Sequence, residues 1–330
     1  MSRIAVLGAG AWGTALTLSL ARRGGHELIL WSHSVPLAEQ LRENGENLPY
    51  LPGFTLPVDV HVTSELPEAI FEADILLCVT PSQHLRGVLT HIAPLLTRNQ
   101  IILSASKGLE ETSFLRMSQV ITSITENRCA VLSGPSFAQE VAAGSPTALV
   151  AAAHDMAVAQ VIQKEFSSPT MRLYTNDDVA GVELGGALKN VIALATGVVH
   201  GVGLGHNSAA ALITRGIAEV TRLAVACGGH RQTLAGLSGL GDLVLTCTGS
   251  LSRNRAVGIE LGRGRHLPEI LADMHGKVAE GVRSTTGALG LAARYGVEMP
   301  ITQSLDQVLH HGKNPREAIR ELMSRPGRDE

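Results

Sequence analysis

The chain opens with Arg3-Ile4-Ala5-Val6-Leu7-Gly8-Ala9-Gly10-Ala11-Trp12-Gly13-Thr14, a short apolar run that leads directly into a Gly-x-Gly-x-x-Gly turn. Gly8 permits a tight turn after a strand, Gly10 lets backbone approach a pyrophosphate, and Gly13 lets the next helix pack close to the sheet. An ordinary glycine-rich turn is the alternative for so short a motif. The strand pattern before it and the helical pattern after it favour a dinucleotide site that includes Gly8, Gly10, Ala11 and Gly13.

The residues that follow the second apolar strand bear on which dinucleotide binds. An NAD-specific site places Asp or Glu about 20 residues after the glycines, on the ribose hydroxyls. Here the strand ends in Ser32-His33, which carries no negative charge to repel a 2′-phosphate. We therefore expect NADPH/NADP as the cofactor, with NADH/NAD also accepted. The alternative is that Ser32 and His33 only cap a loop.

Composition indicates a two-domain globular enzyme. The chain has 330 residues, of which 45% are hydrophobic and 17% charged, and its net charge of −3 argues against nucleic acid as a partner. The four cysteines lack metal-type spacing, so we expect reduced thiols and a cytoplasmic location. The first residues enter a strand at once, from which we expect no signal peptide. Residues 184–199 are the most membrane-like, but Lys189 and Asn190 interrupt them, so we expect a buried helix and no integral membrane segment.

Strand and helix patterns alternate through the first half and predict a doubly wound, mainly parallel sheet, that is, an α/β Rossmann domain at residues 1–177. From residue 178 only helical periodicity appears, which predicts an all-α domain at 178–330. After the first two strands, we expect strands at 58–62, 75–80, 100–104, 130–133 and 147–151, and helices at 36–43, 65–72, 82–96, 112–126, 137–143 and 155–166, with a loop at 44–57.

Two lysines are candidates for chemistry. Lys189 lies in an apolar helical stretch, and burial there should lower the pKa of its ammonium, which suits a group that gives and takes a proton. The alternative is a lysine whose stem reaches the surface. Lys107 precedes Gly108 in a turn at the ligand edge of the sheet. It is placed to bind a phosphate or carbonyl oxygen, although most loop lysines only face solvent.

A cluster in the second half suits a phosphate. Asp242 follows two glycines at the start of a helix, where it could serve only as an N-cap, and Thr246 lies one turn later. Ser252, Arg253 and Asn254 then combine a cap, a guanidinium and an amide at another helix start, which is equipment for holding a phosphate. The histidines form no H-x-x-x-H or H-E-x-x-H pair, so we expect no metal site.

Several long motifs, in order along nearly the whole chain, resemble the bacterial-type NAD(P)-dependent glycerol-3-phosphate dehydrogenase family. The motifs are residues 8–15, 104–110, 132–138 with Glu140-Val141, 183–191, 237–249, 252–255 and 279–282. The resemblance implies a Rossmann domain joined to a helical domain of the 6-phosphogluconate dehydrogenase-like type, usually in a homodimer. It also implies reversible, NAD(P)H-dependent reduction of dihydroxyacetone phosphate to sn-glycerol 3-phosphate for phospholipid synthesis.

The resemblance also implies roles for individual residues. Lys189 would be the proton donor and acceptor, and Lys107 would contact substrate and cofactor. The remaining substrate-binding residues would be Gly134, Ser136, Asp242, Ser252, Arg253 and Asn254, with Asn190 and Thr246 as neighbours, and the cofactor site would include Trp12, His33, Ala138, Val278 and Glu280, with Arg253 shared.

Two alternatives stay open from the residues alone. A related dehydrogenase could act on a carboxylate such as a 3-hydroxyacid, because an arginine fork suits carboxylate as well as phosphate. A non-enzymatic sensor of NAD(P)H could use the same fold, but it would not need Lys107, Lys189 and Asp242 together.

Overall fold

The computed structural model describes residues 1–274 and 279–326. The chain forms two compact units: Met1–Glu110 with Leu115–Glu183, and Glu111–Phe114 with Leu184–Glu330. The backbone thus passes from one unit to the other three times. The domain boundary between residues 177 and 178 remains a prediction.

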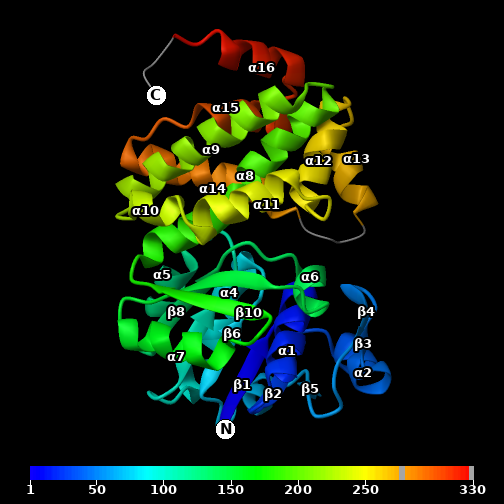
Figure 1. The fold of residues 1–330 in the computed structure, drawn as a ribbon, viewed down its shortest axis with the longest axis vertical. Coiled ribbons are helices and arrows are strands. Elements are labelled where there is room, and N and C mark those ends of the chain that lie inside the picture. The colour runs from blue at the N-terminus through cyan, green and yellow to red at the C-terminus, as the bar shows by residue number, and fades with distance from the viewer. Residues whose placement is uncertain (275–278, 327–330) are drawn as a thin grey trace. The chain divides into compact units, whose positions relative to one another are not determined.

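The first unit contains an eight-stranded sheet in the order β10-β9-β8-β7-β6-β1-β2-β5 (Figure 1). All neighbours are parallel except β8 and β9. The six strands from β5 to β8 have the doubly wound order, with the reversal at β1 and β6, so the mainly parallel Rossmann sheet is confirmed. The strands are β1 (Ser2–Leu7), β2 (His26–Trp31), β5 (His61–Thr63), β6 (Ile75–Cys78), β7 (Ile101–Ser104), β8 (Arg128–Ser133), β9 (Thr147–Ala152) and β10 (Met171–Asn176).

Both faces of the central strands β1, β6 and β7 are buried, and successive side chains of each strand point to opposite faces. In β1, Ile4 and Val6 join one core with α1 (Ala11–Arg23), α2 (Val35–Asn44), α6 (Ala138–Ala142) and α7 (Met156–Phe166). Ala5 and Leu7 join the other core with α3 (Leu66–Ile70), α4 (Ser82–Ile92) and α5 (Met117–Thr122). Residues Ile4–Leu7 of β1 are therefore apolar on both faces of the strand, as its sequence pattern suggested.

Some predicted elements of the first unit differ from those observed. The expected loop 44–57 contains a two-stranded antiparallel sheet of β3 (Glu46–Asn47) and β4 (Leu51–Thr55), in which Pro52 and Gly53 obscured the strand signal. Strand β10 was not predicted. Helix α4 is followed by the 3₁₀ turn η1 (Ala93–Leu95), which contains Pro94, and so ends earlier than expected.

From residue 178 onward the described chain is helical, which confirms the predicted all-α part. The helices are α8 (Val179–Gly201), α9 (His206–Ala226), α10 (Arg231–Leu234), the π turn η2 (Leu237–Gly241), α11 (Asp242–Thr248), α12 (Arg253–Gly262), α13 (Leu267–Asp273), α14 (Glu280–Tyr295), α15 (Pro300–His310) and α16 (Pro315–Met323). Helix α8 is long and apolar enough to cross a membrane, but 94% of its apolar 18-residue stretch is buried in the protein. It is a core helix, as expected.

Helices α8 and α12 touch through glycines. A Cβ on Gly197 would lie 2.2 Å from the Arg255 carbonyl oxygen, and one on Gly258 would lie 2.1 Å from the Leu194 carbonyl oxygen. Gly201 and Gly262 form the same contact one turn later. No other residue permits such close backbones, so these glycines fix the position of α12 against α8.

A buried carboxylate joins α9 to α15. Glu219 is 1% exposed and accepts hydrogen bonds from the backbone N–H groups of Ile301 and Thr302, both at 2.9 Å, and from the Thr302 hydroxyl at 2.6 Å. These are donors at the start of α15, which helical bonding leaves free. Glu219 therefore caps another helix from outside it.

The segment Glu111–Phe114 packs on α14. A Cβ on Gly290 would lie 2.2 Å from the Phe114 ring, and the Arg294 guanidinium lies 5.1 Å from the centre of that ring. Arg294 also donates to the Ser113 carbonyl at 2.7 Å. Phe114 has φ +56°, a left-handed conformation that a bulky residue rarely adopts. These contacts replace the first turns of the helix predicted at 112–126, so only α5 forms there.

Candidate functional site

The glycine turn has the shape that a dinucleotide requires. Gly8 has φ +134°, and a Cβ there would lie 2.9 Å from the Val79 carbonyl oxygen at the end of the neighbouring strand. A Cβ on Gly13 would lie 1.8 Å from the Gly8 carbonyl oxygen, so only glycine lets α1 start this close to β1. At Gly10, by contrast, a Cβ would meet no described atom within 4 Å. The turn is packed on its inner side and open at Gly10.

These features fit an NAD(P) pyrophosphate. Ala11 is the first residue of α1, whose N-terminal N–H groups and dipole favour an anion. The indole N–H of Trp12 is buried, and no described residue accepts a hydrogen bond from it. Together with Gly10, these residues would hold the pyrophosphate.

The two residues after β2 differ in what they offer. Ser32 is 2% exposed, and its hydroxyl bonds to the backbone of Ser34, so it stabilises the turn as the loop-cap alternative expects. His33 is exposed, and its ring lies 6.0 Å from the Trp31 ring. Of the pair, His33 is therefore the residue available to a ribose phosphate.

Three predicted substrate residues meet after β7 and β8. Lys107 Nζ and the Ser136 hydroxyl each donate to the Gly134 carbonyl oxygen at 3.1 Å. Gly134 has φ +140°, which allows the chain to turn sharply after β8. Ala138, predicted at the cofactor site, begins α6 just beyond this turn. The structure thus brings Lys107, Gly134 and Ser136 together within the first unit.

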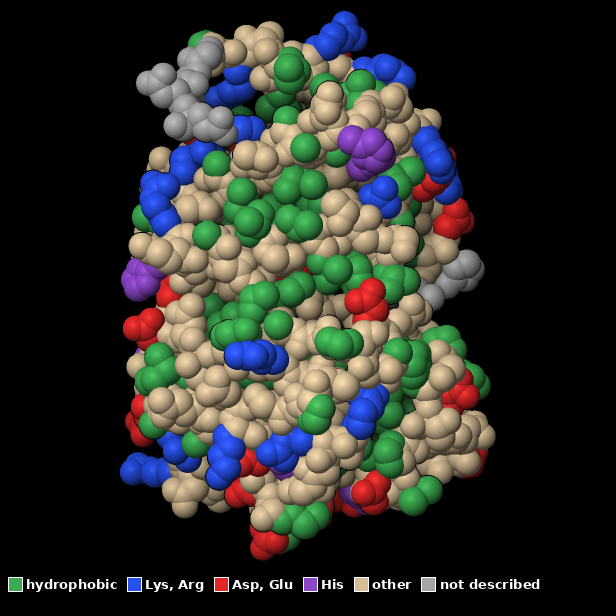
Figure 2. Space-filling model, viewed as in Figure 1, with side chains coloured by type: hydrophobic (Ala, Val, Ile, Leu, Met, Phe, Trp, Pro, Cys, Tyr) green, Lys and Arg blue, Asp and Glu red, His purple; other side chains and the backbone are tan. Residues whose placement is uncertain are grey.

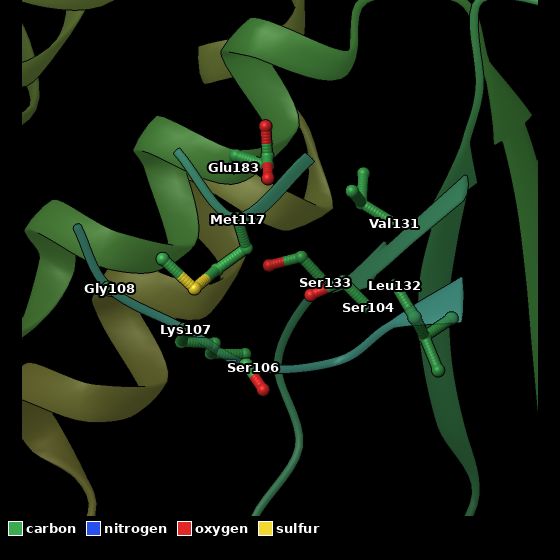
Figure 3. A pocket seen from close by; sticks show the side chains of 9 residues that line it. All are labelled: Ser104, Ser106, Lys107, Gly108, Met117, Val131, Leu132, Ser133 and Glu183. Carbon is green, nitrogen blue, oxygen red and sulfur yellow. The ribbon is translucent and has the colours of Figure 1, made fainter. Parts of the chain in front are cut away.

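A small pocket lies at the carboxyl ends of β7 and β8 (Figure 3). Ser104 and Ser133, on these two strands, are 2% and 5% exposed. Figure 3 shows them beside Met117, with Lys107 and Ser106 on the adjoining turn. The enclosed space fits about one water molecule, so a phosphorylated three-carbon substrate would not fit inside it. Of the predicted site residues, only Lys107 lines this pocket.

In the second unit, Lys189 forms an ion pair with Asp242. The side chains are 10% and 0% exposed, and Lys189 Nζ donates to Asp242 Oδ1. Helix α8 carries the lysine, while the π turn η2 delivers the aspartate at the first position of α11. The apolar sequence around Lys189 predicted its burial but not this pairing. An adjacent carboxylate favours the ammonium form, so burial and pairing act in opposite directions.

The same unit gathers further predicted residues around α8. Asn190 donates to Glu280 Oε2 at 3.2 Å. Asn254 is 9% exposed, and its Oδ1 accepts from the Gly281 N–H at 2.9 Å, which ties the start of α12 to the start of α14. A Cβ on Gly281 would lie 2.6 Å from the Asn190 carbonyl oxygen. Contacts between residues 27 and 90 positions apart in the chain thus hold this cluster together.

The residues predicted to bind the substrate phosphate, Ser252, Arg253 and Asn254, lie at the start of α12. Ser252 caps the helix by accepting from the Arg255 N–H at 3.3 Å. Arg253 is the first helical residue and is exposed. Thr246 is 4% exposed, and its hydroxyl donates to the Asp242 carbonyl at 2.6 Å within α11. Arg253 is therefore the accessible charge of this cluster.

No three His, Cys, Asp or Glu side chains of residues 1–274 and 279–326 cluster as metal ligands would. Val278, predicted at the cofactor site, lies outside the residues that the structure describes.

Sequence reasoning missed two features of the site. It did not pair Lys189 with Asp242, because a separation of 53 residues leaves no local signal. It also gave no role to Asn47, whose amide contacts the glycine turn from the unpredicted β3. An isolated Asn before a Pro- and Gly-containing stretch indicates only a turn.

Comparison with known proteins identifies relatives over the whole chain. Residues 3–159 match the family described as NAD-dependent glycerol-3-phosphate dehydrogenase N-terminus, and residues 178–320 match its C-terminus. Glycerol-3-phosphate dehydrogenase (NAD(P)+) of Acidobacterium capsulatum is 62% identical, with 100% of both chains covered, and that of Koribacter versatilis is 55% identical, with 100% of this chain and 99% of the relative covered. The crystal structure of glycerol-3-phosphate dehydrogenase from Coxiella burnetii is 39% identical, covers 98% of this chain and 99% of its own, and has a TM-score of 0.94.

Proposed function

The chain belongs to the NAD-dependent glycerol-3-phosphate dehydrogenase family, and from this premise we propose that it reduces dihydroxyacetone phosphate to sn-glycerol 3-phosphate, reversibly, to supply phospholipid synthesis. The protein is an NAD(P)-dependent oxidoreductase. The observation that carries the proposed chemistry is the buried pair of Lys189 and Asp242, because an ammonium held by a carboxylate can protonate an oxygen that becomes an alkoxide.

The cofactor would be held by the glycine turn. Gly10, Ala11 and Trp12 would bind the pyrophosphate, and His33 would contact the adenosine ribose. A bound reduced nicotinamide supplies the hydride. Because His33 carries no negative charge, we propose that NADPH is used at least as well as NADH.

The substrate would be held at both of its ends. Arg253 and the start of α12 would bind the phosphate, with a charge-assisted fork and helix N–H groups. Lys189 would bind the oxygen of the reacting carbon and give up its proton as the alkoxide forms. From family membership we propose that Lys107 contacts substrate and cofactor. Asn190, Asn254 and Thr246 are positioned by bonds inside the cluster and would shape its wall.

Two further proposals follow from family membership. We propose that two copies associate as a homodimer, which light scattering coupled to size-exclusion chromatography would test. We also propose a cytoplasmic location, which fractionation of the source cells would test.

One assay separates the candidate functions. Purified protein is mixed with NADPH and dihydroxyacetone phosphate, and absorbance of the reduced nicotinamide is followed at about 340 nm. Rapid oxidation with this substrate, and slow oxidation with 3-oxoacids, supports the proposal. The reverse preference supports the carboxylate-directed dehydrogenase, and NADPH binding without turnover supports the sensor. Growth of a glycerol 3-phosphate auxotroph that carries this gene tests the direction of the reaction in cells.

A further inference from the structure

Asn47 is a buried polar residue whose whole amide is bonded. It lies in β3 and is 0% exposed. Its Nδ2 donates to the Ala9 carbonyl at 2.9 Å and to Thr14 Oγ1 at 2.7 Å. Its Oδ1 accepts from the Tyr50 N–H at 3.3 Å. Ala9 lies between Gly8 and Gly10, so one of these bonds is made to the dinucleotide turn itself.

The bond to Ala9 sets the direction of one peptide group. In a trans peptide the carbonyl and the following N–H point in opposite directions. The Ala9 carbonyl is turned inward to Asn47, so the Gly10 N–H is turned away from it. Gly10 is the position where no described atom fills the space beside the backbone. The bonded amide of Asn47 thus fixes the direction of the Gly10 N–H, at the residue of the turn that has open space beside its Cα.

The short sheet that carries Asn47 is firmly held. Leu51, on β4, is 1% exposed and belongs to the apolar core that also contains Leu16 of α1. Leu56 donates to the Gly45 carbonyl at 2.6 Å, which closes the base of the segment. Asn47 therefore has a fixed support from which to hold the turn.

We propose that Asn47 is a positioning residue for the cofactor: it orients the Ala9–Gly10 peptide so that the Gly10 N–H meets the pyrophosphate. Asn47 does not itself contact the ligand. The inference rests on NAD(P) as the cofactor and does not depend on which substrate is reduced.

The test measures binding of NADPH directly, by titration of its fluorescence, with no substrate present. Asn47→Leu removes the amide and should raise the Kd about tenfold, which corresponds to one lost hydrogen bond to a charged group. Thr14→Val is the matched control, because it removes the other bond of the same amide and leaves the Ala9 peptide untouched. Its Kd should stay within about threefold of wild type.

A second variant covers the case in which Asn47→Leu does not fold. Asn47→Asp keeps the size and can still accept from the Thr14 hydroxyl, but it places a carboxylate oxygen against the Ala9 carbonyl, so the Kd should again rise. NADH shares the pyrophosphate, so its Kd should rise by the same factor as that of NADPH. A folded Asn47 variant with wild-type Kd, an equal loss in Thr14→Val, or unequal factors for the two cofactors would overturn the proposal. Because dihydroxyacetone phosphate is absent, an enzyme with another substrate would give the same binding result.

Discussion

Asp242 lies against the ammonium of Lys189 with its side chain fully buried, although the two residues are 53 positions apart. A buried carboxylate that loses its cation is strongly destabilising, because its charge is then neither hydrated nor paired. Any test of Lys189 must therefore separate its chemical role from its role as a partner of Asp242.

Lys189→Met should lower kcat by about 10²–10⁴-fold, the usual contribution of a general acid. It should also lower the free energy of unfolding by about 3–5 kcal/mol, since the buried Asp242 carboxylate loses the ammonium that faces it. The double variant Lys189→Met/Asp242→Asn should regain most of that stability and none of the turnover. Steady-state kinetics and urea unfolding measure the two effects, with Lys164→Met, at an exposed position, as the control. Near-normal kcat in Lys189→Met would assign the proton to another group.

Arg253→Ala should raise the KM for dihydroxyacetone phosphate by roughly 10- to 150-fold, because a hydrogen bond to a charged group contributes roughly 1.5–3 kcal/mol. Arg263→Ala is the control, since this arginine follows the end of the same helix and is 63% exposed. Initial rates at varied substrate concentration decide the matter. Equal KM values for the two variants would show that Arg253 does not bind the phosphate.

His33→Asp should shift cofactor use towards NADH, because a carboxylate accepts from ribose hydroxyls and repels a 2′-phosphate. The ratio of kcat/KM for NADPH to that for NADH should fall by up to about fivefold, the scale of one exposed charge pair. His154→Asp is a suitable control, because His154 follows β9, which runs opposite to β8 and so ends at the other edge of the sheet. A ratio that does not change would place the ribose phosphate away from His33.

Glu219 should make stability depend on pH. Burial raises the pKa of its carboxyl above the ordinary 4.5, against the opposing effect of its three hydrogen bonds and of Arg222. The folded protein then binds the proton more tightly than the unfolded chain, so the contribution of Glu219 is full below pH 4.5 and decreases as the pH rises through the folded pKa. The stability of wild type minus that of Glu219→Gln, from urea unfolding at several pH values, should therefore shrink with rising pH. A difference that grows would mean that the hydrogen bonds dominate.

Gly258→Ala should destabilise the protein by about 1–3 kcal/mol or more, because the new methyl group overlaps the Leu194 carbonyl and pushes α12 away from α8. Gly87 is also within a helix, but a Cβ there would meet no described atom within 4 Å. Gly87→Ala should instead stabilise by about 0.5–1 kcal/mol through helix propensity. Thermal or urea unfolding compares the two, and a similar effect of both would contradict the close contact.

The parts of the fold that sequence predicted are those with strong local signals. The strand–turn–helix at Gly8 is encoded within a dozen residues, and short runs of apolar residues predict the buried strands of the sheet. Strand β10 was missed although Met171 and Leu173 are buried and Arg172 and Tyr174 are exposed, so four residues of alternation were the available signal.

The parts that sequence could not predict depend on distant partners. The pairing of Lys189 with Asp242 requires the π turn before α11, and helix propensity carries no information about such a turn. Glu219 lies three and four residues from Arg222 and Arg215, which is the spacing of exposed ion pairs, yet its carboxylate bonds to α15. At Phe114 the contacts with Gly290 and Arg294 override a helical pattern.

The packing of Phe114 on α14 limits how the gene can be divided. A fragment that stops at residue 177 or 183 would carry Phe114 without Gly290 and Arg294. In the complementary fragment, the surface of α14 that the Phe114 ring covers would be exposed to water. The left-handed backbone of Phe114 would then lack the contacts that hold it. Two co-expressed fragments should therefore recover activity only if Phe114 of the first fragment packs on Gly290 and Arg294 of the second. Recovery of activity by such a pair would thus measure the contribution of the Phe114 side chain to assembly.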